Sequence, residues 1–279
     1  MSAGPRFPLR LLGVGPQRTG SSWLDRHLRR HPALAFPEGV KETFFFDRHW
    51  DRGATDYEGH FRRAAPGRHW AEIGPTYFDV PEVPARVRDS APEACVVVTL
   101  RDPVERAVSL YQHHFRKGRV PESFWAAEAR EPRIVSAGEY ARHLPRWLNA
   151  LGEDRVIVVL LDDVEATPEA VLASVLGAAG LDSRGASAEP GRVNAGSRPR
   201  YPALAGAAAR TATALRDRRL HGLVEAGKRL GLGRVYRGGG DPPAVSRETR
   251  ERLADHYALD IAFVERLTGR TLPWGQPGA

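Results

Sequence analysis

The fold is decided by residues 9–24, LRLLGVGPQRTGSSWL, in which an apolar run passes through a tight turn into an amphipathic segment. The run 9–14 is short and apolar, as a parallel strand covered on both faces is. Beyond the turn, Trp23, Leu24 and Leu28 recur at helical spacing. The stretch therefore predicts a buried strand, a loop and a helix.

The loop between this strand and this helix has the chemistry of an anion site. Gly15 and Gly20 let the backbone curl closely, and the first N–H groups of a helix have no intrahelical partner. Ser21 and Ser22 add hydroxyl donors beside the positive end of the helix dipole. We expect a phosphate or a sulfate to bind there.

The loop differs from the P-loop of nucleoside triphosphate enzymes, G-x-x-x-x-G-K-S/T, in the place of its cation. Gly20 is followed by Ser21 rather than by lysine, and Arg18 lies inside the loop. A guanidinium there can bind two anionic oxygens without a metal ion. A glycine-rich turn alone is weak evidence, so the other motifs decide the interpretation.

The composition fits one α/β domain over residues 1–279, because 42% hydrophobic content supports a sizeable core. The formal net charge of +7 is compatible with an anionic cofactor, a nucleic acid or a solvated surface. The arginines are dispersed along the chain, without a basic stretch interleaved with aromatic residues. We therefore expect no nucleic-acid partner.

Cysteine usage and hydropathy bound the compartment. Cys95 is the sole cysteine, which excludes an intramolecular disulfide and a multi-cysteine metal site. The N-terminus has no apolar signal region, and no stretch approaches the roughly 18 apolar residues that span a bilayer. These features predict a soluble, cytoplasmic protein without a membrane span.

A second strand-to-helix junction follows the β-branched run 94–100, after a shorter strand over 70–78 and a helix over 83–90. Asp102 fits an N-cap, with Glu105 as its capping-box partner. Arg101 then lies at the carboxyl end of a central strand, where open α/β sheets bind ligands. The alternative is a local ion pair of Arg101 with Asp102 or Glu105.

Residues 40–47, VKETFFFD, place a Lys-Glu pair directly before three aromatic residues, and two interpretations remain open. In one, the segment is a short edge strand whose phenylalanines enter the core while Lys41 and Glu42 face water. In the other, Glu42 lies against an apolar wall that raises its proton affinity, and Lys41 restrains it. The second makes Glu42 a candidate general base.

Residues 101–109, RDPVERAVS, are similar to the 3'-phosphate signature of sulfotransferases that use 3'-phosphoadenosine 5'-phosphosulfate (PAPS). The order of motifs resembles the branch of heparan sulfate O-sulfotransferases and N-deacetylase/N-sulfotransferases. The matching motifs are Gln17-Arg18-Thr19-Gly20, Lys41-Glu42 before Phe45-Phe46-Asp47, Glu72 with Pro75 and Tyr77-Phe78, and Arg101 to Ser109.

This resemblance implies a three-layer α/β fold like that of P-loop nucleotide hydrolases, with a central parallel sheet and flanking helices. PAPS is then the co-substrate, leaving as adenosine 3',5'-bisphosphate, and no metal is implied. The cofactor-binding residues are then Gln17, Arg18, Thr19, Gly20, Ser21, Ser22 and Trp23, with the 5'-phosphosulfate at Arg18 to Ser22, and the 3'-phosphate is held by Arg101 and Ser109. Glu42 acts as the base, and Arg18 and Lys41 offset developing charge. The rival bases are His49, His113 and His114, since relatives acting on phenols and steroids use histidine.

The second half is less distinctive. It predicts a helix over 124–149, a strand over 155–163, helices over 167–177 and 246–269, and a weakly defined lobe over 180–233 near the acceptor side. That lobe contains a surface loop (183–200) and a basic amphipathic stretch (210–230). Arg237 and Gly238 match the first positions of a family loop that closes over the nucleotide, whereas Gly239 and Asp241 depart from it.

Other departures bear on the acceptor. Ile73 stands where the heparan-type enzymes carry lysine, and the Golgi anchor and disulfide of those enzymes have no counterpart in this sequence. We therefore expect a hydroxylated small molecule, a natural product or a glycolipid rather than a glycosaminoglycan. The alternatives are a P-loop kinase-like phosphotransferase with Asp162 or Asp163 as magnesium ligand, and a polyanion-binding protein. The sequence leaves the oligomeric state open.

Overall fold

A computed structural model describes residues 6–184, 187–188, 198–199, 237–239 and 242–276. Its central sheet has five strands in the order β2-β3-β1-β4-β5, and every neighbouring pair is parallel. The strands are β1 (Leu9–Gly15), β2 (Leu34–Ala35), β3 (His69–Ile73), β4 (Cys95–Leu100) and β5 (Val156–Leu160). The carboxyl ends of all five strands therefore meet at one edge, as predicted for an α/β fold.

Eleven described helices surround the sheet. They are α1 (Ser21–Leu28), α2 (Phe45–Arg48), α3 (Ala54–Glu58), α4 (Val83–Ser90), α5 (Pro103–Arg116), α6 (Phe124–Arg130), α7 (Arg133–Ser136), α8 (Tyr140–Leu151), α9 (Leu161–Ala166), α10 (Pro168–Ala178) and α14 (Arg247–Thr268). Short 3-10 turns cover Trp50–Arg52 and Glu153–Arg155. The strands β6 (Arg198–Pro199) and β7 (Arg237–Gly239) pair antiparallel away from this sheet.

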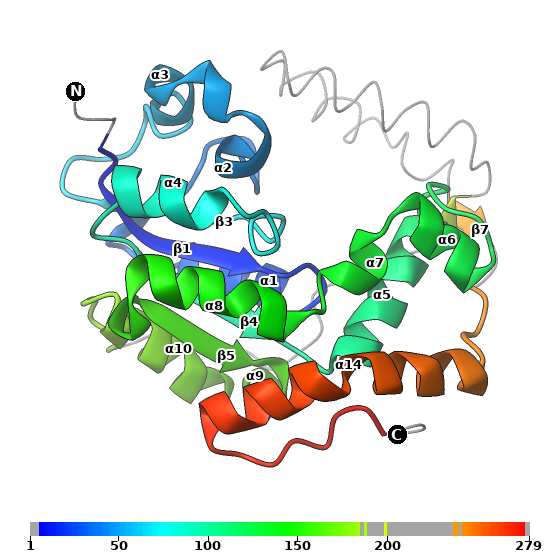
Figure 1. Ribbon diagram of the computed structural model, residues 1–279. Helices are drawn as coiled ribbons and strands as arrows, with labels where there is room; N and C mark the ends of the chain where they lie inside the picture. The colour runs from blue at the N-terminus through cyan, green and yellow to red at the C-terminus, as the bar shows by residue number, and fades with distance from the viewer. Residues whose placement is uncertain (1–5, 185–186, 189–197, 200–236, 240–241, 277–279) are drawn as a thin grey trace.

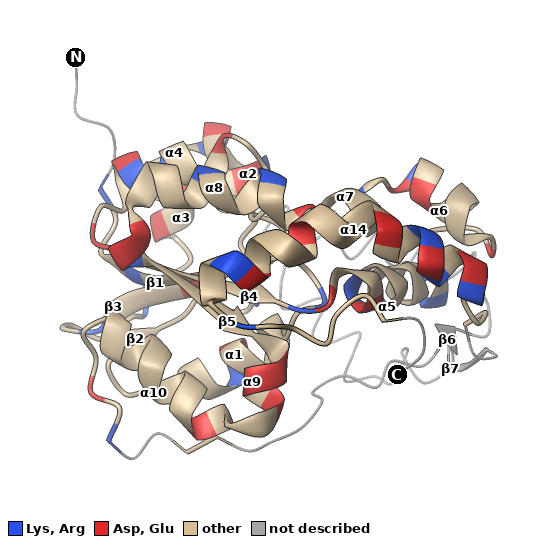
Figure 2. Cartoon of the chain, turned by 60° about the horizontal axis from the view of Figure 1, so that its bottom comes forward, with Lys and Arg blue, Asp and Glu red and all other residues tan. Residues whose placement is uncertain are grey.

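Helices cover both faces of the sheet, which makes three layers. One apolar cluster packs α2, α3, α4 and α8 on one face, and a second packs α1, α9 and α10 on the other (Figure 2). Strand β4 alternates between them: Val96 and Val98 belong to the first cluster, Cys95 and Val97 to the second. Because both faces are buried, the strand reads as a continuous apolar run.

A third apolar cluster lies beyond the carboxyl edge, where α5, α6, α7 and part of α14 extend from the sheet (Figure 1). The buried guanidinium of Arg106 ties α5 to α7, since Nη2 donates to the carbonyl of Ile134 at 2.6 Å. Helix α14 joins the clusters, with Tyr257 in the third and Val264 in the first. This side lobe forms a wall at the edge of the sheet where ligands are expected.

The strand, loop and helix predicted from residues 9–24 are present as β1 and α1, and the predicted helix after Arg101 is α5. Asp102 is its N-cap, because the side chain accepts from the backbone N–H of Val104 at 2.8 Å. The capping box is only half formed. Glu105 instead pairs with Arg250 of α14 and with Arg101.

The interpretation of residues 40–47 as an edge strand is wrong. Phe44 has a left-handed φ of 56°, and α2 starts at the next residue. Phe45 and Phe46 are buried against Phe7 and Tyr57, as the pattern predicted for the core. Lys41 and Glu42 thus lie on a turn that precedes a one-turn helix, and not on a strand.

The single helix predicted over 124–149 is three helices, α6, α7 and α8. Pro132 has no N–H to continue α6. Helix α7 ends at Ser136, and Gly138 then lies so close to α14 that a side chain there would come within 2.9 Å of the Tyr257 hydroxyl. The chain therefore turns between α6 and α7 and again between α7 and α8.

The strand predicted to run to residue 163 ends at Leu160, so Asp162 and Asp163 lie in the first turn of α9 and not at a strand end. Most of the expected lobe over 180–233, including all of 210–230, lies outside the described residues. Among the helices that the structure does describe, none is long and apolar enough to cross a membrane.

Candidate active site

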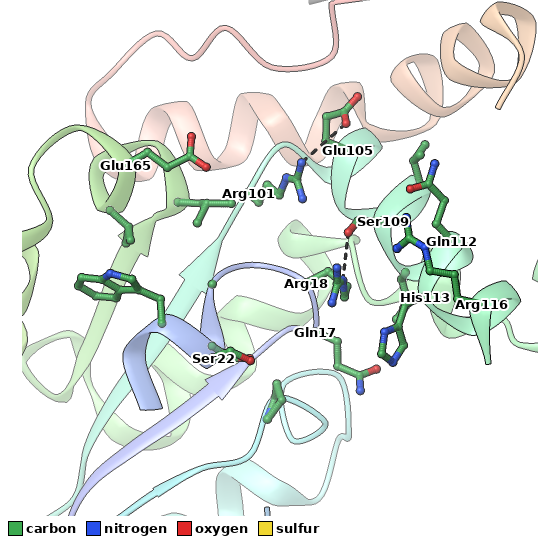
Figure 3. Close-up of a pocket in the computed structure, with 18 of the residues that line it drawn as sticks. Gln17, Arg18, Ser22, Arg101, Glu105, Ser109, Gln112, His113, Arg116 and Glu165 are labelled. Carbon is green, nitrogen blue, oxygen red and sulfur yellow. Dashed lines mark hydrogen bonds and ion pairs between the residues drawn. The ribbon is translucent and has the colours of Figure 1, made fainter. Parts of the chain in front are cut away.

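A cavity of about 860 Å³ opens at the carboxyl edge of the sheet, between the β1–α1 loop and α5 (Figure 3). Its lining comes from six separate segments of the chain. The lining residues are Gln17, Arg18, Gly20, Ser21, Ser22, Trp23, Lys41, Glu42, Pro75, Arg101, Glu105, Val108, Ser109, Leu110, Gln112, His113, Arg116, Lys117, Leu161, Val164, Glu165 and Arg250. The predicted site residues of the loop, of the Lys-Glu pair and of the 101–109 motif are thus brought together.

One predicted residue of the loop, Thr19, does not belong to this lining. Thr19 is fully buried, and its hydroxyl donates to the carbonyl of Pro16 at 2.6 Å and contacts the Thr99 hydroxyl at 2.7 Å. It therefore ties the loop to β4 and does not line the cavity. Arg237 and Gly238 lie on β7, where the structure describes the backbone pairing with β6 and no side chains.

The β1–α1 loop owes its curl to left-handed residues. Gly20, the N-cap of α1, has a φ of 102°, and a side chain there would come within 3.0 Å of Leu161. Glycine is the one residue that adopts this backbone at no steric cost. Arg18 is also left-handed, with a φ of 74°, which is rare for a residue with a long side chain. This conformation leaves Arg18 on the wall of the cavity.

The Arg18 guanidinium joins the two predicted anion sites. Its Nε donates to Oγ of Ser109 on α5 at 3.0 Å (Figure 3). Burial lowers the pKa of Arg18, and the positive charges of Arg101 and Arg116 lower it further. Three guanidiniums that repel one another around one cavity favour a ligand with several negative charges.

Arg101 follows β4 directly, and the Tyr140 hydroxyl donates to its carbonyl at 2.7 Å. Its Nη2 lies 3.7 Å from a carboxylate oxygen of Glu105, so the local pair considered from the sequence exists. The pair does not remove Arg101 from the cavity wall. Glu105 is shared with Arg250, which reaches the same cavity from α14.

Lys41 and Glu42 line the cavity beside the start of α1. The Lys41 Nζ donates to Oγ of Ser22 at 3.0 Å and lies 3.8 Å from a carboxylate oxygen of Glu42. Burial raises the pKa of Glu42 to about 7 against the opposing charge of Lys41, and the negative charges of Glu72 and Asp47 add to the rise. A carboxyl with this pKa exchanges protons near neutral pH, as a general base must.

Of the three histidines considered as rival bases, His113 is the one among the lining residues. Burial lowers its pKa to about 3, and the charges of Lys117 and Arg18 act in the same direction. Burial likewise lowers the pKa of His114 to about 4. An imidazole with so low a pKa is neutral at pH 7 but a weak proton acceptor.

Asp162 and Asp163 do not line the cavity. Asp162 accepts from the indole N–H of Trp274 at 3.2 Å, and Asp163 accepts from Arg270 at 2.7 Å. Both carboxylates therefore bind the segment that follows α14. Neither provides the magnesium ligand that the phosphotransferase alternative requires.

Several lining residues were not predicted from the sequence. Gln112 and Arg116 follow Ser109 on α5 by three and seven residues, so helical periodicity placed them on the same face. Arg250 and Glu165 have no such signal in the sequence, because their place in the cavity lining depends on how α14 and α9 pack.

Comparisons with known proteins agree with this geometry. The sulfotransferase domain family model matches residues 9–189. Mouse heparan sulfate glucosamine 3-O-sulfotransferase 6 is 35% identical over 159 residues, which cover 53% of this chain and 46% of the mouse protein. The bifunctional heparan sulfate N-deacetylase/N-sulfotransferase 1 of Caenorhabditis elegans is 28% identical over 182 residues, covering 59% of this chain and 21% of the worm protein. The chain thus spans less than half the length of either relative.

The crystal structure of a sulfotransferase from Alicyclobacillus acidocaldarius has the same fold, with a TM-score of 0.64 at 21% identity over 95% of this chain and 97% of that chain. The family match includes the strand–loop–helix over 9–24, the Lys41-Glu42 turn and the 101–109 motif. These are the segments that build the cavity. The chain belongs to the sulfotransferase family.

Proposed function

We propose that this protein transfers the sulfuryl group of PAPS to a hydroxyl of a small-molecule, natural-product or glycan acceptor. The observation that carries the proposal is the convergence of separate cations and one basic carboxyl on a single cavity. Arg18 and Arg101 lie on either side of Ser109 (Figure 3), and Glu42 lines the same cavity beside Lys41. A ligand with two anionic ends and an acceptor that must lose a proton both fit this arrangement.

The residues present fit PAPS as the co-substrate. The loop over 18–22 combines a guanidinium, two hydroxyls and the N-terminus of α1, which suits the 5'-phosphosulfate. Arg101 and Ser109 suit the 3'-phosphate. When bound, PAPS supplies an activated sulfuryl group, with adenosine 3',5'-bisphosphate as the leaving group. Burial lowers the pKa of Arg18, and the charges of Arg101 and Arg116 lower it further, so a bound anion would favour its charged form.

In this proposal each residue has a defined task. Glu42 accepts the proton of the acceptor hydroxyl, which makes that oxygen a better nucleophile. Arg18 and Lys41 donate hydrogen bonds where negative charge grows, a form of stabilisation that acts mainly on the transition state. Ser22 holds Lys41 in place through the 3.0 Å hydrogen bond.

The acceptor class is inferred from what the cavity contains. Ile73 is fully buried in the apolar cluster beneath α1 and contributes no charge to the cavity. This supports a small hydroxylated acceptor over a long polyanionic chain. The curated relatives named above act on heparan sulfate through both O- and N-sulfation, so transfer to oxygen is part of the proposal.

The test is a transfer assay with radiolabelled PAPS in EDTA, run against a panel of small alcohols, phenols, glycolipids and glycan oligosaccharides. We expect labelled sulfate in a product with the wild-type protein, and a loss of roughly 10²–10⁴-fold in kcat with Glu42→Gln. A parallel arm uses ATP labelled on its γ-phosphate with magnesium. Phosphate transfer in that arm and none from PAPS would overturn the proposal.

A further inference from the structure

A second carboxyl, Glu72 on β3, lies behind the cavity wall and does not line it. It is fully buried, and it accepts four hydrogen bonds. Oε1 accepts from the backbone N–H and the hydroxyl of Thr43 at 3.0 and 2.6 Å and from the Tyr77 hydroxyl at 2.8 Å. Oε2 accepts from the Tyr57 hydroxyl at 2.9 Å.

The direction of these hydrogen bonds favours an ionised Glu72. The Thr43 hydroxyl accepts from the backbone N–H of Phe45 at 3.1 Å, which leaves its proton to donate to Glu72. Burial raises the pKa of Glu72, and the donors from Thr43, Tyr77 and Tyr57 oppose that rise. Four donors around one carboxyl group stabilise its charged form.

The contact with Thr43 connects Glu72 to the cavity. Thr43 follows Glu42 directly, and the left-handed Phe44 comes next. Two hydrogen bonds from Thr43 therefore hold this turn against the Glu72 carboxylate. The residues that precede this anchor, Lys41 and Glu42, are the ones that reach the cavity.

The charges that face Glu42 come from several elements. Lys41, its neighbour in the chain, and Arg48 of α2 favour its ionised form, whereas Glu72 of β3 and Asp47 of α2 disfavour it. Arg18 of the β1–α1 loop and His113 of α5 line the same cavity.

We propose that Glu72 is a positioning residue: through Thr43 it holds the turn that carries Lys41 and Glu42, and it places a fixed negative charge behind Glu42. The proposal rests on the proposed function in that it takes Glu42 as the base. Glu72 itself touches neither substrate. A merely structural role would predict lower stability on its removal and an unchanged proton affinity of Glu42.

The test is an NMR titration of the Glu42 carboxyl in protein with isotope-labelled glutamate, assigned by the signal that disappears in Glu42→Gln. Glu72→Gln keeps the shape of the side chain and removes its charge. We expect the titration midpoint of Glu42 to fall by roughly 0.5–1 pH unit, since the loss of a neighbouring negative charge acts on this scale. The matched control is Asp260→Asn, which neutralises a buried carboxyl that accepts from the backbone of Ala141, away from the cavity. An unshifted midpoint in Glu72→Gln, or an equal shift in the control, would overturn the proposal.

A second pair of variants tests the connection itself. Thr43→Val removes the hydroxyl, and Thr43→Ser keeps it. We expect the Glu42 midpoint to move toward its ordinary value in the valine variant and to stay near the wild-type midpoint in the serine variant. Identical midpoints in both would contradict the positioning role.

These titrations need neither PAPS nor an acceptor, so the two proposals fail separately. A wild-type protein that transfers no sulfate removes the proposed function, while the titration still decides whether Glu72 controls Glu42. Transfer by the wild type together with an unshifted Glu42 in Glu72→Gln removes only the positioning role.

Discussion

Arg18 combines an unfavourable backbone with a particular placement of its charge. A left-handed φ of 74° at a residue with a long side chain costs of order 1 kcal/mol or more, and such conformations cluster at functional sites. What the fold gains is the contact of the guanidinium with Ser109, a residue 91 positions away in the chain. The unfavourable backbone conformation of Arg18 is consistent with a role in binding an anion whose charge grows during the reaction.

Arg18→Ala is therefore expected to affect turnover more than nucleotide affinity. We expect kcat to fall by roughly 10²–10³-fold, as when one donor to a developing anion is removed, and the dissociation constant of adenosine 3',5'-bisphosphate to rise about tenfold. Steady-state kinetics and calorimetry measure the two. Arg116→Ala is the control, since it removes another arginine of the same cavity. If affinity fell and kcat did not, Arg18 would be an anchor only.

Glu42 links the proposed activity to stability. Its pKa in the folded protein is about 7 against an ordinary value of 4.5, so the folded state binds its proton more tightly than the unfolded state does. The contribution of Glu42 to the free energy of unfolding is therefore fully present below about pH 4.5 and is lost as the pH rises through about 7. Above pH 8 the free energy of unfolding is lower by about 3 kcal/mol on this account.

Glu42→Gln should consequently stabilise the protein at pH 8 relative to the wild type, and by much less at pH 5. Urea unfolding at the two pH values measures the difference. A gain in free energy of unfolding that is equal at both pH values would show that the pKa of Glu42 is not raised. The same substitution removes the proposed base, so stability and transfer are expected to change in opposite directions at pH 8.

The single residues whose place in the cavity could be predicted from the sequence are those that belong to a short motif. Arg18, Lys41, Glu42, Arg101 and Ser109 all belong to short motifs, and all line the cavity. Thr19 was expected at the ligand, but its hydroxyl instead contacts the Thr99 hydroxyl of the neighbouring strand β4. The direction of a side chain in a tight loop depends on what lies behind the loop, which spacing does not contain.

Among the elements, α5 depends on its first residues. Asp102 accepts from the backbone N–H groups of Val104 and Glu105 through one oxygen and from Gly275 at 2.9 Å through the other. Asp102→Ala should lower the free energy of unfolding by about 2 kcal/mol, since it removes an N-cap and a second partly buried hydrogen bond. Asp102→Ser, which retains a capping oxygen, should cost less.

Thr167→Ala is the control for this prediction. Thr167 is the N-cap residue of α10, but its side chain makes no capping hydrogen bond. We expect its removal to change the free energy of unfolding by less than about 0.5 kcal/mol. Chemical denaturation of the three variants measures the series. Equal costs for Asp102→Ala and Thr167→Ala would show that the cap does not stabilise α5.

Elements with a strong local pattern were predicted well, and elements defined by a tertiary contact were not. The apolar run of β4 and the capping signal of Asp102 identify a strand and the helix after it. Of the two interpretations open for residues 40–47, the edge strand is wrong, and the sequence pattern could not exclude it because Glu72, which binds Thr43, lies 29 residues away. Gly138 lies between α7 and α8, where a side chain would meet Tyr257 of α14, and sequence spacing does not contain that contact.

At the scale of the whole molecule, the cavity is assembled from both ends of the described chain. Arg250 reaches Glu105 across 145 residues, and no spacing rule predicts that contact. Acidic and basic residues are interspersed along α14 (Figure 2), so this helix does not carry a continuous basic stretch. That residues 1–279 form a single domain stays a prediction, because 200–236 lie outside the described part.

The proposed function requires two anion sites in one cavity, and one measurement tests both. Adenosine 3',5'-bisphosphate and 5'-AMP share the 5'-phosphate and differ in the 3'-phosphate. A charge-assisted hydrogen bond to phosphate contributes roughly 1.5–3 kcal/mol, so the wild type should bind the bisphosphate at least about tenfold more tightly in EDTA. Arg101→Ala should erase most of that preference, whereas the control Asp260→Asn should retain it.

Isothermal titration calorimetry of the three proteins with the two nucleotides makes the comparison. We expect the wild-type protein to prefer the bisphosphate strongly in the absence of metal, and we expect this preference to depend on Arg101. Equal affinities for both nucleotides in the wild-type protein, or binding that requires magnesium, would contradict it.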